Sequence, residues 1–276
     1  MLFSFLVAQY NNGKYFKDCY KSIIAQTYTN WEVIIVDDGS TDNSLEIIDE
    51  IIGDDPRFKI YKIANNKGCG YAKRECVKHA SGDICGFLDP DDAVVETAVE
   101  EMMETHSKFK DVGLVYSNTT YCDADLAPRK VKKVKQVKNF ESDFSNLDYY
   151  ISHFTTFKKS YYDKTIGIDE YLQRAVDQDL YVKLYEVGKV YYLDKDLYNY
   201  RVHKNGISTL NNKWKAKYWH WVVIAKAGRR RGVNLDHLFE KYEAFTPREK
   251  LLEAELLTYN KSVIFKVLRK LGVFKI

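Results

Sequence analysis

Residues 86–92, with the sequence GFLDPDD, decide how the rest of the chain is interpreted. The apolar run at 84–88 indicates a buried strand that ends where the carboxylates begin. Three aspartates within four positions repel one another, so a cation or a hydrogen-bond network must neutralise them. Oxygen ligands at this spacing suit Mg²⁺ or Mn²⁺, ions that commonly bridge a carboxylate to a substrate phosphate. The alternative is a polar turn in which an aspartate caps a helix beginning at Ala93.

The amino-acid composition is that of an ordinary globular protein. The 276 residues are 45% hydrophobic and 29% charged, enough for a sizeable core. The formal charge of +3 is too small to indicate nucleic-acid binding. We see no run of 18 apolar residues and no basic segment before the strand-like stretch at 2–7. Five cysteines without a CxxC pair favour reduced thiols, so we expect a cytoplasmic protein.

Strands and helices alternate along the first 92 residues. Apolar, β-branched runs predict strands at 3–8, 31–36, 58–63 and 84–88, and helical spacing predicts helices at 14–26, 43–52 and 71–79. This order predicts an open, parallel α/β sheet with right-handed crossovers. Ligands bind such sheets at the carboxyl ends of the strands. Asp37 and Asp38 follow one strand and the three aspartates of 89–92 follow another, so both clusters belong to the expected ligand edge.

The pattern after residue 92 is less regular. It predicts a helix at 94–109, a strand at 112–118, a turn at 121–125 and an irregular, aromatic-rich stretch at 143–157. Residues 128–138 hold six lysines and arginines, which favours a solvated edge strand over a loop that covers an anionic ligand. A helix at 177–186, strands at 189–193 and 198–203, and a helical region after 208 complete the prediction.

Five short segments match one family in their order. The sequence resembles the family 2 glycosyltransferases, which have the GT-A fold and use nucleotide-diphospho-sugars, over residues 1–208. The matching segments are 26–32 (QTYTNWE), 36–42 (VDDGSTD), 66–68 with 72–74 (NKG and AKR), 81–92 (SGDICGFLDPDD) and 200–203 (YRVH). The resemblance implies a GT-A, Rossmann-like and mostly parallel sheet flanked by helices. It divides the chain into a catalytic domain at 1–208, with a nucleotide-sugar half at 1–118 and an acceptor half at 119–208, and a C-terminal helical extension at 209–276.

The same resemblance assigns the donor site. It implies that Asp91 is the main protein ligand of Mn²⁺ or Mg²⁺, with His203 near the ion or the diphosphate. Asp89 would contact the ribose or the water shell of the ion, and Asp38 would bind the uracil ring or fix its own loop. The remaining donor-binding residues that it implies are Tyr10, Gly68 and Arg74. Ser40 and Thr41 are interpreted as caps of the following helix.

An inverting transferase also needs a base that deprotonates the acceptor hydroxyl. The family uses the aspartate of a Glu-Asp pair at the start of a late helix, and this aspartate aligns with Asp177. Val176 replaces the usual glutamate. Asp179 is the alternative base if the helix begins elsewhere, and both acids would be helix-terminal residues of local value if neither is catalytic.

The predicted function is transfer of a sugar from a UDP-sugar to a glycan or lipid-linked glycan acceptor in surface polysaccharide synthesis. Two alternatives are a phosphotransferase of the haloacid-dehalogenase type, because DPDD partly mimics its nucleophile motif, and a nucleotide-sugar binder without a base. Residues 261–276 alternate apolar and basic side chains. This pattern allows peripheral contact with the inner face of a membrane, or packing of a helix on the protein itself.

Overall fold

The computed structural model describes residues 1–137, 146, 149–203, 213–236 and 238. Contacts divide the chain into two compact units, Met1–Ala227 and Gly228–Ile276. The predicted domain boundary after residue 208 and the amphipathic stretch 261–276 lie outside the described residues. The fold and the site described below belong to the first unit.

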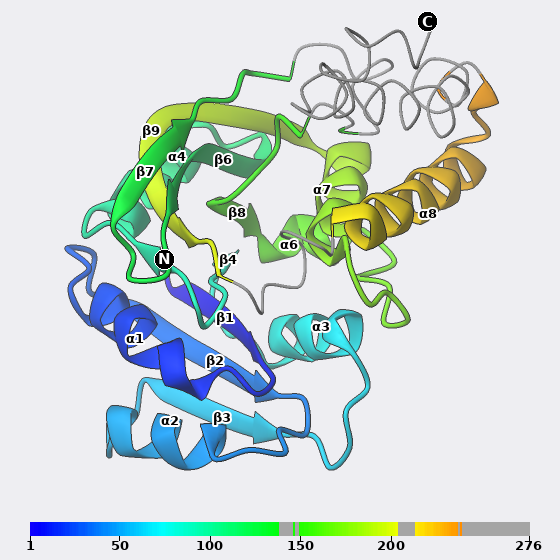
Figure 1. Ribbon diagram of the computed structural model, residues 1–276. Coiled ribbons are helices and arrows are strands. Elements are labelled where there is room, and N and C mark those ends of the chain that lie inside the picture. The colour runs from blue at the N-terminus through cyan, green and yellow to red at the C-terminus, as the bar shows by residue number, and fades with distance from the viewer. Residues whose placement is uncertain (138–145, 147–148, 204–212, 237, 239–276) are drawn as a thin grey trace, which may run out of the picture. The chain divides into compact units, whose positions relative to one another are not determined.

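The first four strands form the parallel sheet that the sequence predicts. β1 (Phe3–Gln9), β2 (Trp31–Asp37), β3 (Phe58–Lys62) and β4 (Ile84–Phe87) lie in the order β3-β2-β1-β4, and each neighbouring pair is parallel. A short 3₁₀ turn, η1 (Gly13–Tyr15), leads into α1 (Phe16–Ile24), and α2 (Ser44–Ile52) and α3 (Cys69–His79) connect the later strands (Figure 1). All four strands therefore end at one edge of the sheet.

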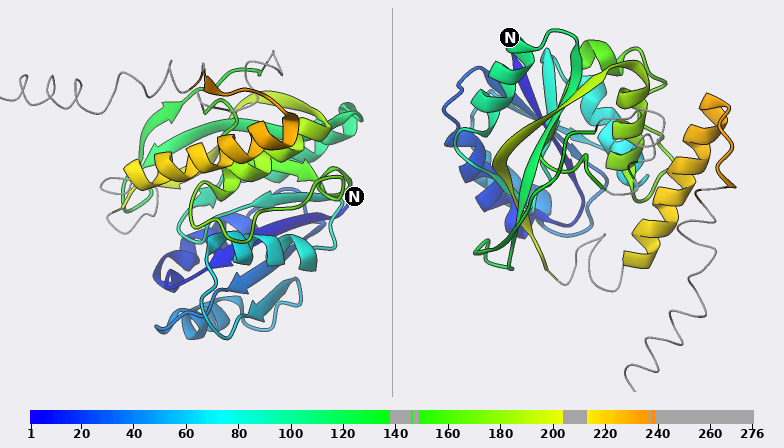
Figure 2. Two further views of the ribbon diagram at one scale, coloured as in Figure 1. Left: turned by 90° about the vertical axis from the view of Figure 1, so that its right-hand side faces the viewer. Right: turned by 90° about the horizontal axis from the view of Figure 1, so that it is seen from above.

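The helices cover both faces of these strands. Phe3, Phe5 and Val7 of β1 alternate with polar or opposite-facing positions and join one buried apolar cluster with Phe16 of α1 and Ile48 of α2. The helix α3 lies on the other face, as the view from above shows (Figure 2). Burial on both faces explains why β2 is apolar along nearly its whole length.

Beyond β4 the sheet is mixed. β8 (Thr155–Lys158) is inserted between β4 and β6 (Val112–Cys122) and is antiparallel to both. β9 (Lys189–Arg201) is parallel to β6, while β5 (Ala93–Val94) pairs antiparallel with β9 and β7 (Pro128–Lys132) pairs antiparallel with β6. The helices of this part are α4 (Ala98–Lys108), α6 (Lys159–Tyr162), α7 (Val176–Val187) and α8 (Lys213–Arg231).

Several predicted elements differ from the structure. The helix expected at 94–109 begins only at Ala98, because Ala93 and Val94 pair with β9 instead of opening a helix. The two strands expected at 189–193 and 198–203 are the single strand β9. The irregular stretch at 143–157 includes the start of β8. The basic stretch does contain an edge strand, β7, and its side chains are mostly exposed as predicted.

Ser40 and Thr41 do not cap α2. The Ser40 hydroxyl donates to Asp37 Oδ1 at 2.5 Å and accepts from the Asn11 backbone N–H at 2.9 Å, so it ties the loop after β2 to the loop after β1. Thr41 likewise contacts the Asn11 side chain. The cap prediction was wrong because Asn43 takes the N-cap position of α2, while both hydroxyls contact Asn11 in a loop that is adjacent in space and remote in sequence.

No helix among the described residues is both long enough and apolar enough to cross a bilayer.

Candidate active site

A cavity of about 690 Å³ opens at the carboxyl ends of β1, β2 and β4. Both predicted carboxylate clusters contribute to its lining, so the two strand ends do meet there. Six of the residues proposed for the site from the sequence line it: Tyr10, Asp38, Gly68, Asp89, Asp91 and Asp177. Its lining also includes Lys73, His153, Arg174 and Arg201, which the sequence analysis did not select.

Asp38 fixes the loop that follows β3. Its two carboxylate oxygens accept hydrogen bonds from the backbone N–H groups of Lys67 (2.8 Å) and Gly68 (2.7 Å). Burial raises the pKa of Asp38, although these two hydrogen bonds oppose the shift. Gly68 has φ +98°, a conformation that favours glycine and brings its N–H toward the carboxylate. Of the two roles considered for Asp38, the structure contains the loop-fixing contact.

The aspartates after β4 have different environments. Asp92 is buried and accepts from the Tyr198 hydroxyl (2.8 Å) and the Arg201 backbone N–H (2.7 Å), both on β9. Burial together with the charges of Asp91 and Asp89 raises the pKa of Asp92 well above its usual value. All three aspartates contribute to the cavity lining, but Asp92 is buried and anchors the acidic turn to β9, whereas the side chains of Asp89 and Asp91 are 30% and 18% exposed.

The late YRVH segment meets this acidic turn. The imidazole Nε2 of His203 lies 2.7 Å from Asp91 Oδ2. The guanidinium of Arg201 donates through Nε to the Asp91 carbonyl (2.6 Å) and through Nη2 to Asp18 (2.7 Å). Two motifs that are more than one hundred residues apart thus form one constellation.

The pair of Asp91 and His203 fits a divalent ion that takes its other ligands from a substrate. A carboxylate oxygen and an imidazole nitrogen are both ligands of Mn²⁺-like ions, and Mg²⁺ in nucleotide sites is often held by only one or two carboxylates plus phosphate oxygens. Within the described part of the chain, no group of three or more His, Cys, Asp or Glu side chains is arranged to hold a metal. An ion held by this pair would therefore need further ligands from outside the described side chains.

Lys73 is the central residue that the sequence analysis missed. Its ammonium lies 2.6 Å from Asp177 Oδ1 and 3.2 Å from Asp89 Oδ1, and its side chain is only 4% exposed. Burial lowers the pKa of Lys73, but the two carboxylates outweigh burial and raise it well above its usual value. A signal was present, because Lys73 shares the buried face of α3 with Gly70, Cys76 and Val77 at helical spacing.

Asp177 lies in the first turn of α7 and contacts Lys73 directly at the cavity wall. Its side chain is 23% exposed. Burial raises the pKa of Asp177, but Lys73 and the neighbouring His153 outweigh burial and hold that pKa below its usual value. Ala175, which precedes the helix, adopts a left-handed conformation with φ +55°, and this sharp turn leads the chain into α7. Val176, in place of a glutamate, is buried.

Asp179 does not line the cavity. Two positions along a helix correspond to a rotation of roughly 200°, so Asp179 and Asp177 lie on opposite faces of α7. Asp179 is fully buried and forms an ion pair with Lys183 at 2.6 Å. Its location therefore gives no support to the alternative base.

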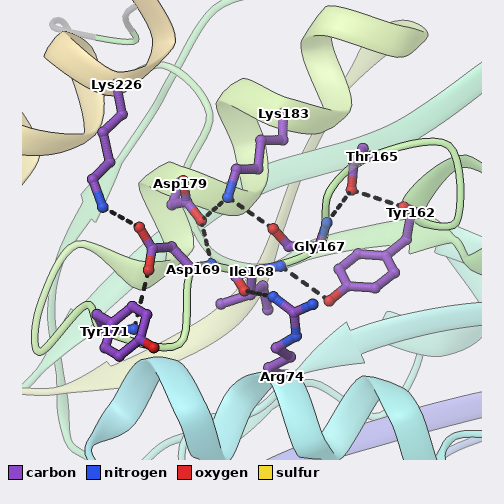
Figure 3. Close-up of polar contacts among 10 residues, drawn as sticks. All are labelled: Arg74, Tyr162, Thr165, Gly167, Ile168, Asp169, Tyr171, Asp179, Lys183 and Lys226. Atoms are coloured by element: carbon purple, nitrogen blue, oxygen red, sulfur yellow. Dashed lines mark hydrogen bonds and ion pairs between the residues drawn. The ribbon is translucent and has the colours of Figure 1, made fainter. Parts of the chain in front are cut away.

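Arg74 also lies outside the cavity lining. Its Nη1 donates to the Ile168 carbonyl at 2.7 Å, and Figure 3 shows the side chain pointing from α3 toward the loop that contains Ile168. One position along α3 separates it from Lys73, a rotation of roughly 100°. Of these two cations on α3, Lys73 is therefore the one that lines the cavity, and the donor-binding role of Arg74 stays a prediction.

The model of the protein family described as glycosyl transferase family 2 matches residues 4–166, which is more than half of the chain. The chain belongs to this family. It therefore has glycosyltransferase ancestry over the residues that form the cavity from Tyr10 to His153.

Similar proteins agree with this assignment. The chain is 30% identical to a hyaluronan synthase of Pasteurella multocida over 96% of its own length, but it spans only 26% of that protein. It is 28% identical to the putative teichuronic acid biosynthesis glycosyltransferase TuaG of Bacillus subtilis, over 91% of this chain and 98% of TuaG. The crystal structure of S. aureus TarS 1–349 in complex with UDP-GlcNAc superposes with a TM-score of 0.67 at 21% identity, covering 81% of this chain and 65% of that one. This structural likeness confirms the predicted GT-A type of α/β fold.

Proposed function

We propose that this glycosyltransferase moves a sugar from a UDP-sugar to a glycan or lipid-linked glycan acceptor, with inversion, in the synthesis of a surface polysaccharide. The observation that carries the proposal is one cavity in which Asp89, Asp91 and Asp177 all face the same space, with Lys73 between Asp89 and Asp177. The names of the hyaluronan synthase and of TuaG support a polysaccharide product, and the TarS complex supports a UDP-sugar donor.

On the donor side, we assign the nucleotide to the loops after β1, β2 and β3, through Tyr10 and the loop that Asp38 fixes. Asp89 is assigned to the ribose. Asp91 and His203 would hold Mn²⁺ or Mg²⁺, which when bound stabilises the charge of the departing diphosphate as a Lewis acid.

On the acceptor side, we assign Asp177 as the base. Oδ1 accepts from Lys73, which leaves Oδ2 as the atom that takes the proton of the acceptor hydroxyl. The lowered pKa keeps this carboxylate in the ionised form that a base requires, although it also makes the carboxylate a weaker proton acceptor. The acceptor oxygen forms a bond to the anomeric carbon, the bond from that carbon to the phosphate oxygen breaks, and its electron pair leaves with the diphosphate.

Calorimetric titration with UDP tests the donor half. We expect wild-type protein to bind UDP more tightly with Mn²⁺ than without, and Asp91→Asn to lose that difference. Asp125→Asn, a change at an exposed turn, is the matched control and should behave as wild type. Absence of UDP binding with and without Mn²⁺ would refute the donor assignment.

Hydrolysis of UDP-sugars tests the base. A screen of UDP-sugars should identify one that the wild type hydrolyses slowly, and Asp177→Asn should reduce that turnover about 10²–10⁴-fold while UDP binding persists. Val176, where the family has a glutamate, favours a second candidate, a binder without catalytic activity. Binding of UDP without turnover of any UDP-sugar in wild type would support that candidate. The position of the acidic turn, after the fourth strand of a chain that belongs to the glycosyl transferase family 2, disfavours the phosphotransferase alternative.

A lipid-linked acceptor would suit a location at the inner face of a membrane. Deletion of residues 261–276 followed by sedimentation with anionic liposomes tests that contact, and unchanged sedimentation would exclude this stretch as the anchor.

A further inference from the structure

The residues between α6 and α7 form one wall of the cavity. We call residues 163–175 the wall loop. Its last residues, Gln173, Arg174 and Ala175, line the cavity, and the chain then enters α7 and reaches Asp177 two residues later. The position of the wall loop therefore sets where α7 begins and, with it, where Asp177 lies.

A buried ion pair on α7 holds the wall loop from one side. Asp179 Oδ2 accepts from the backbone N–H of Asp169 at 2.9 Å, and Lys183 Nζ donates to the carbonyl of Gly167 at 2.7 Å. The two side chains also pair with each other at 2.6 Å and are 0% and 3% exposed. Figure 3 shows both reaching from α7 to the backbone of the loop. The pair thus satisfies one backbone donor and one backbone acceptor of the loop.

Other elements hold the same loop from further sides. Gly70 of α3 donates its N–H to the Leu172 carbonyl at 2.9 Å, and a side chain at Gly70 would lie only 2.4 Å from the Asp169 carbonyl oxygen. The Tyr162 hydroxyl accepts from the Ile168 N–H at 3.0 Å. On α8, Lys226 forms an ion pair with the Asp169 side chain (Figure 3). Contacts from α3 and α8 thus fall on the stretch that Asp179 and Lys183 also bind.

A gain in stability does not explain the buried ion pair of Asp179 and Lys183. Burying two charges costs several kcal/mol per ion, and apolar residues of similar volume often replace such pairs at no cost. Asp179 Oδ1 has no hydrogen-bond partner in the described structure, which adds a further penalty. Apolar replacements, however, would leave the Asp169 N–H and the Gly167 carbonyl without these partners. The pair therefore has a specific effect on the position of the loop backbone.

We propose that Asp179 and Lys183 are positioning residues for the transfer reaction: they fix the wall loop, and through it Asp177, opposite Lys73 and Asp89. The inference rests on the proposed function of Asp177 as the base. It assigns the two acids of α7 different tasks, because Asp177 faces the cavity and Asp179 holds the wall from behind.

Hydrogen exchange, UDP calorimetry and UDP-sugar hydrolysis test this proposal on the full chain. The decisive variant is the double change Asp179→Leu with Lys183→Met, which removes both charges together and so leaves no unpaired buried charge. We expect amide exchange in residues 163–175 to accelerate about tenfold or more, since two backbone hydrogen bonds are lost. UDP affinity should stay within about twofold, and turnover of the UDP-sugar should fall about 10–100-fold, because small displacements of a reacting group are costly.

Two controls separate positioning from general stability. Lys183→Arg retains a charged donor for Asp179 and for the Gly167 carbonyl, so it should preserve both slow exchange and turnover. Asp111→Asn with Lys189→Met removes an ion pair whose side chains are 63% and 75% exposed, and it should change neither property.

Slow exchange of the wall loop or wild-type turnover in the Leu/Met variant would overturn the proposal. If wild-type protein hydrolyses no UDP-sugar, the proposed function fails, and wall-loop exchange in the Leu/Met variant still decides whether the pair fixes the loop.

Discussion

Acidification should destabilise this fold through His106, and His106→Gln should remove that effect. His106 lies on α4, is 1% exposed, and its Nε2 is 3.0 Å from the Thr156 hydroxyl of β8. Burial and, to a lesser degree, the charge of Lys158 lower its pKa from 6.5 to about 3. Between these two pH values the unfolded chain binds a proton that the folded protein does not, so stability falls as the pH decreases from 6.5. The loss is about 1.4 kcal/mol per pH unit, or about 2 kcal/mol by pH 5.

Urea unfolding at pH 7.5 and pH 5.0 measures this loss of unfolding free energy. The decrease in unfolding free energy between the two pH values should be about 2 kcal/mol smaller for His106→Gln than for wild type. Glutamine keeps a polar group within reach of Thr156 and does not titrate, so the comparison cancels the contributions of the other groups. His79→Gln removes a partly exposed histidine that is stacked on Tyr61 and retains His106, so it is the matched control. Equal pH dependence of wild type and His106→Gln would refute this reasoning.

Three further substitutions have expected effects on unfolding free energy, each measured by urea denaturation at pH 7.5. Lys73→Met should cost about 3 kcal/mol, because it leaves two partly shielded carboxylates without their cation, and an unchanged midpoint would contradict the assignment of this ion pair. Ala175→Gly should add up to about 1 kcal/mol, since glycine relieves the left-handed backbone at φ +55°, whereas a loss would show that no strain is stored there. Arg201→Lys should cost about 2–3 kcal/mol, because a single ammonium cannot reach Asp18 and the Asp91 and Ala124 carbonyls together, and a neutral result would mean that the planar fork is dispensable.

The parallel half of the fold followed from local patterns, and the mixed half did not. β1 to β4 are apolar runs separated by helices of matching length, so periodicity and chain order were sufficient to predict them. β8 has only four residues and pairs with strands about 40 and 70 residues away, and its sequence TTFK shows no alternation that distinguishes it from a loop. β5 is likewise a strand only because β9 lies beside it. Short strands of this kind depend on tertiary pairing, which a local pattern does not contain.

The sequence predicted correctly which residues at strand ends line the cavity, but on helix α3 it selected a cation that lies outside the cavity lining. A carboxylate after a parallel strand has its place set by the sheet, and Asp38, Asp89 and Asp91 all line the cavity. A helical side chain moves by roughly 100° for each position along the chain, so the choice of Arg74 instead of Lys73 selects a different environment. The buried neighbours of Lys73 along α3 were the information that favoured it, and a lysine among them requires an acidic partner.

The two acids of α7 differ already in their sequence neighbours, without any knowledge of the fold. Asp179 has a lysine four residues later on its own helix, at Lys183, so the helix itself supplies a cation for its charge. Asp177 has Leu180 and Tyr181 at the corresponding positions, so a cation for its charge has to come from another element. In the structure that cation is Lys73 of α3, which also contacts Asp89. An acid with no local partner at the start of a helix is therefore the better candidate for a site assembled from several elements, and the base assignment to Asp177 depends on that remote contact.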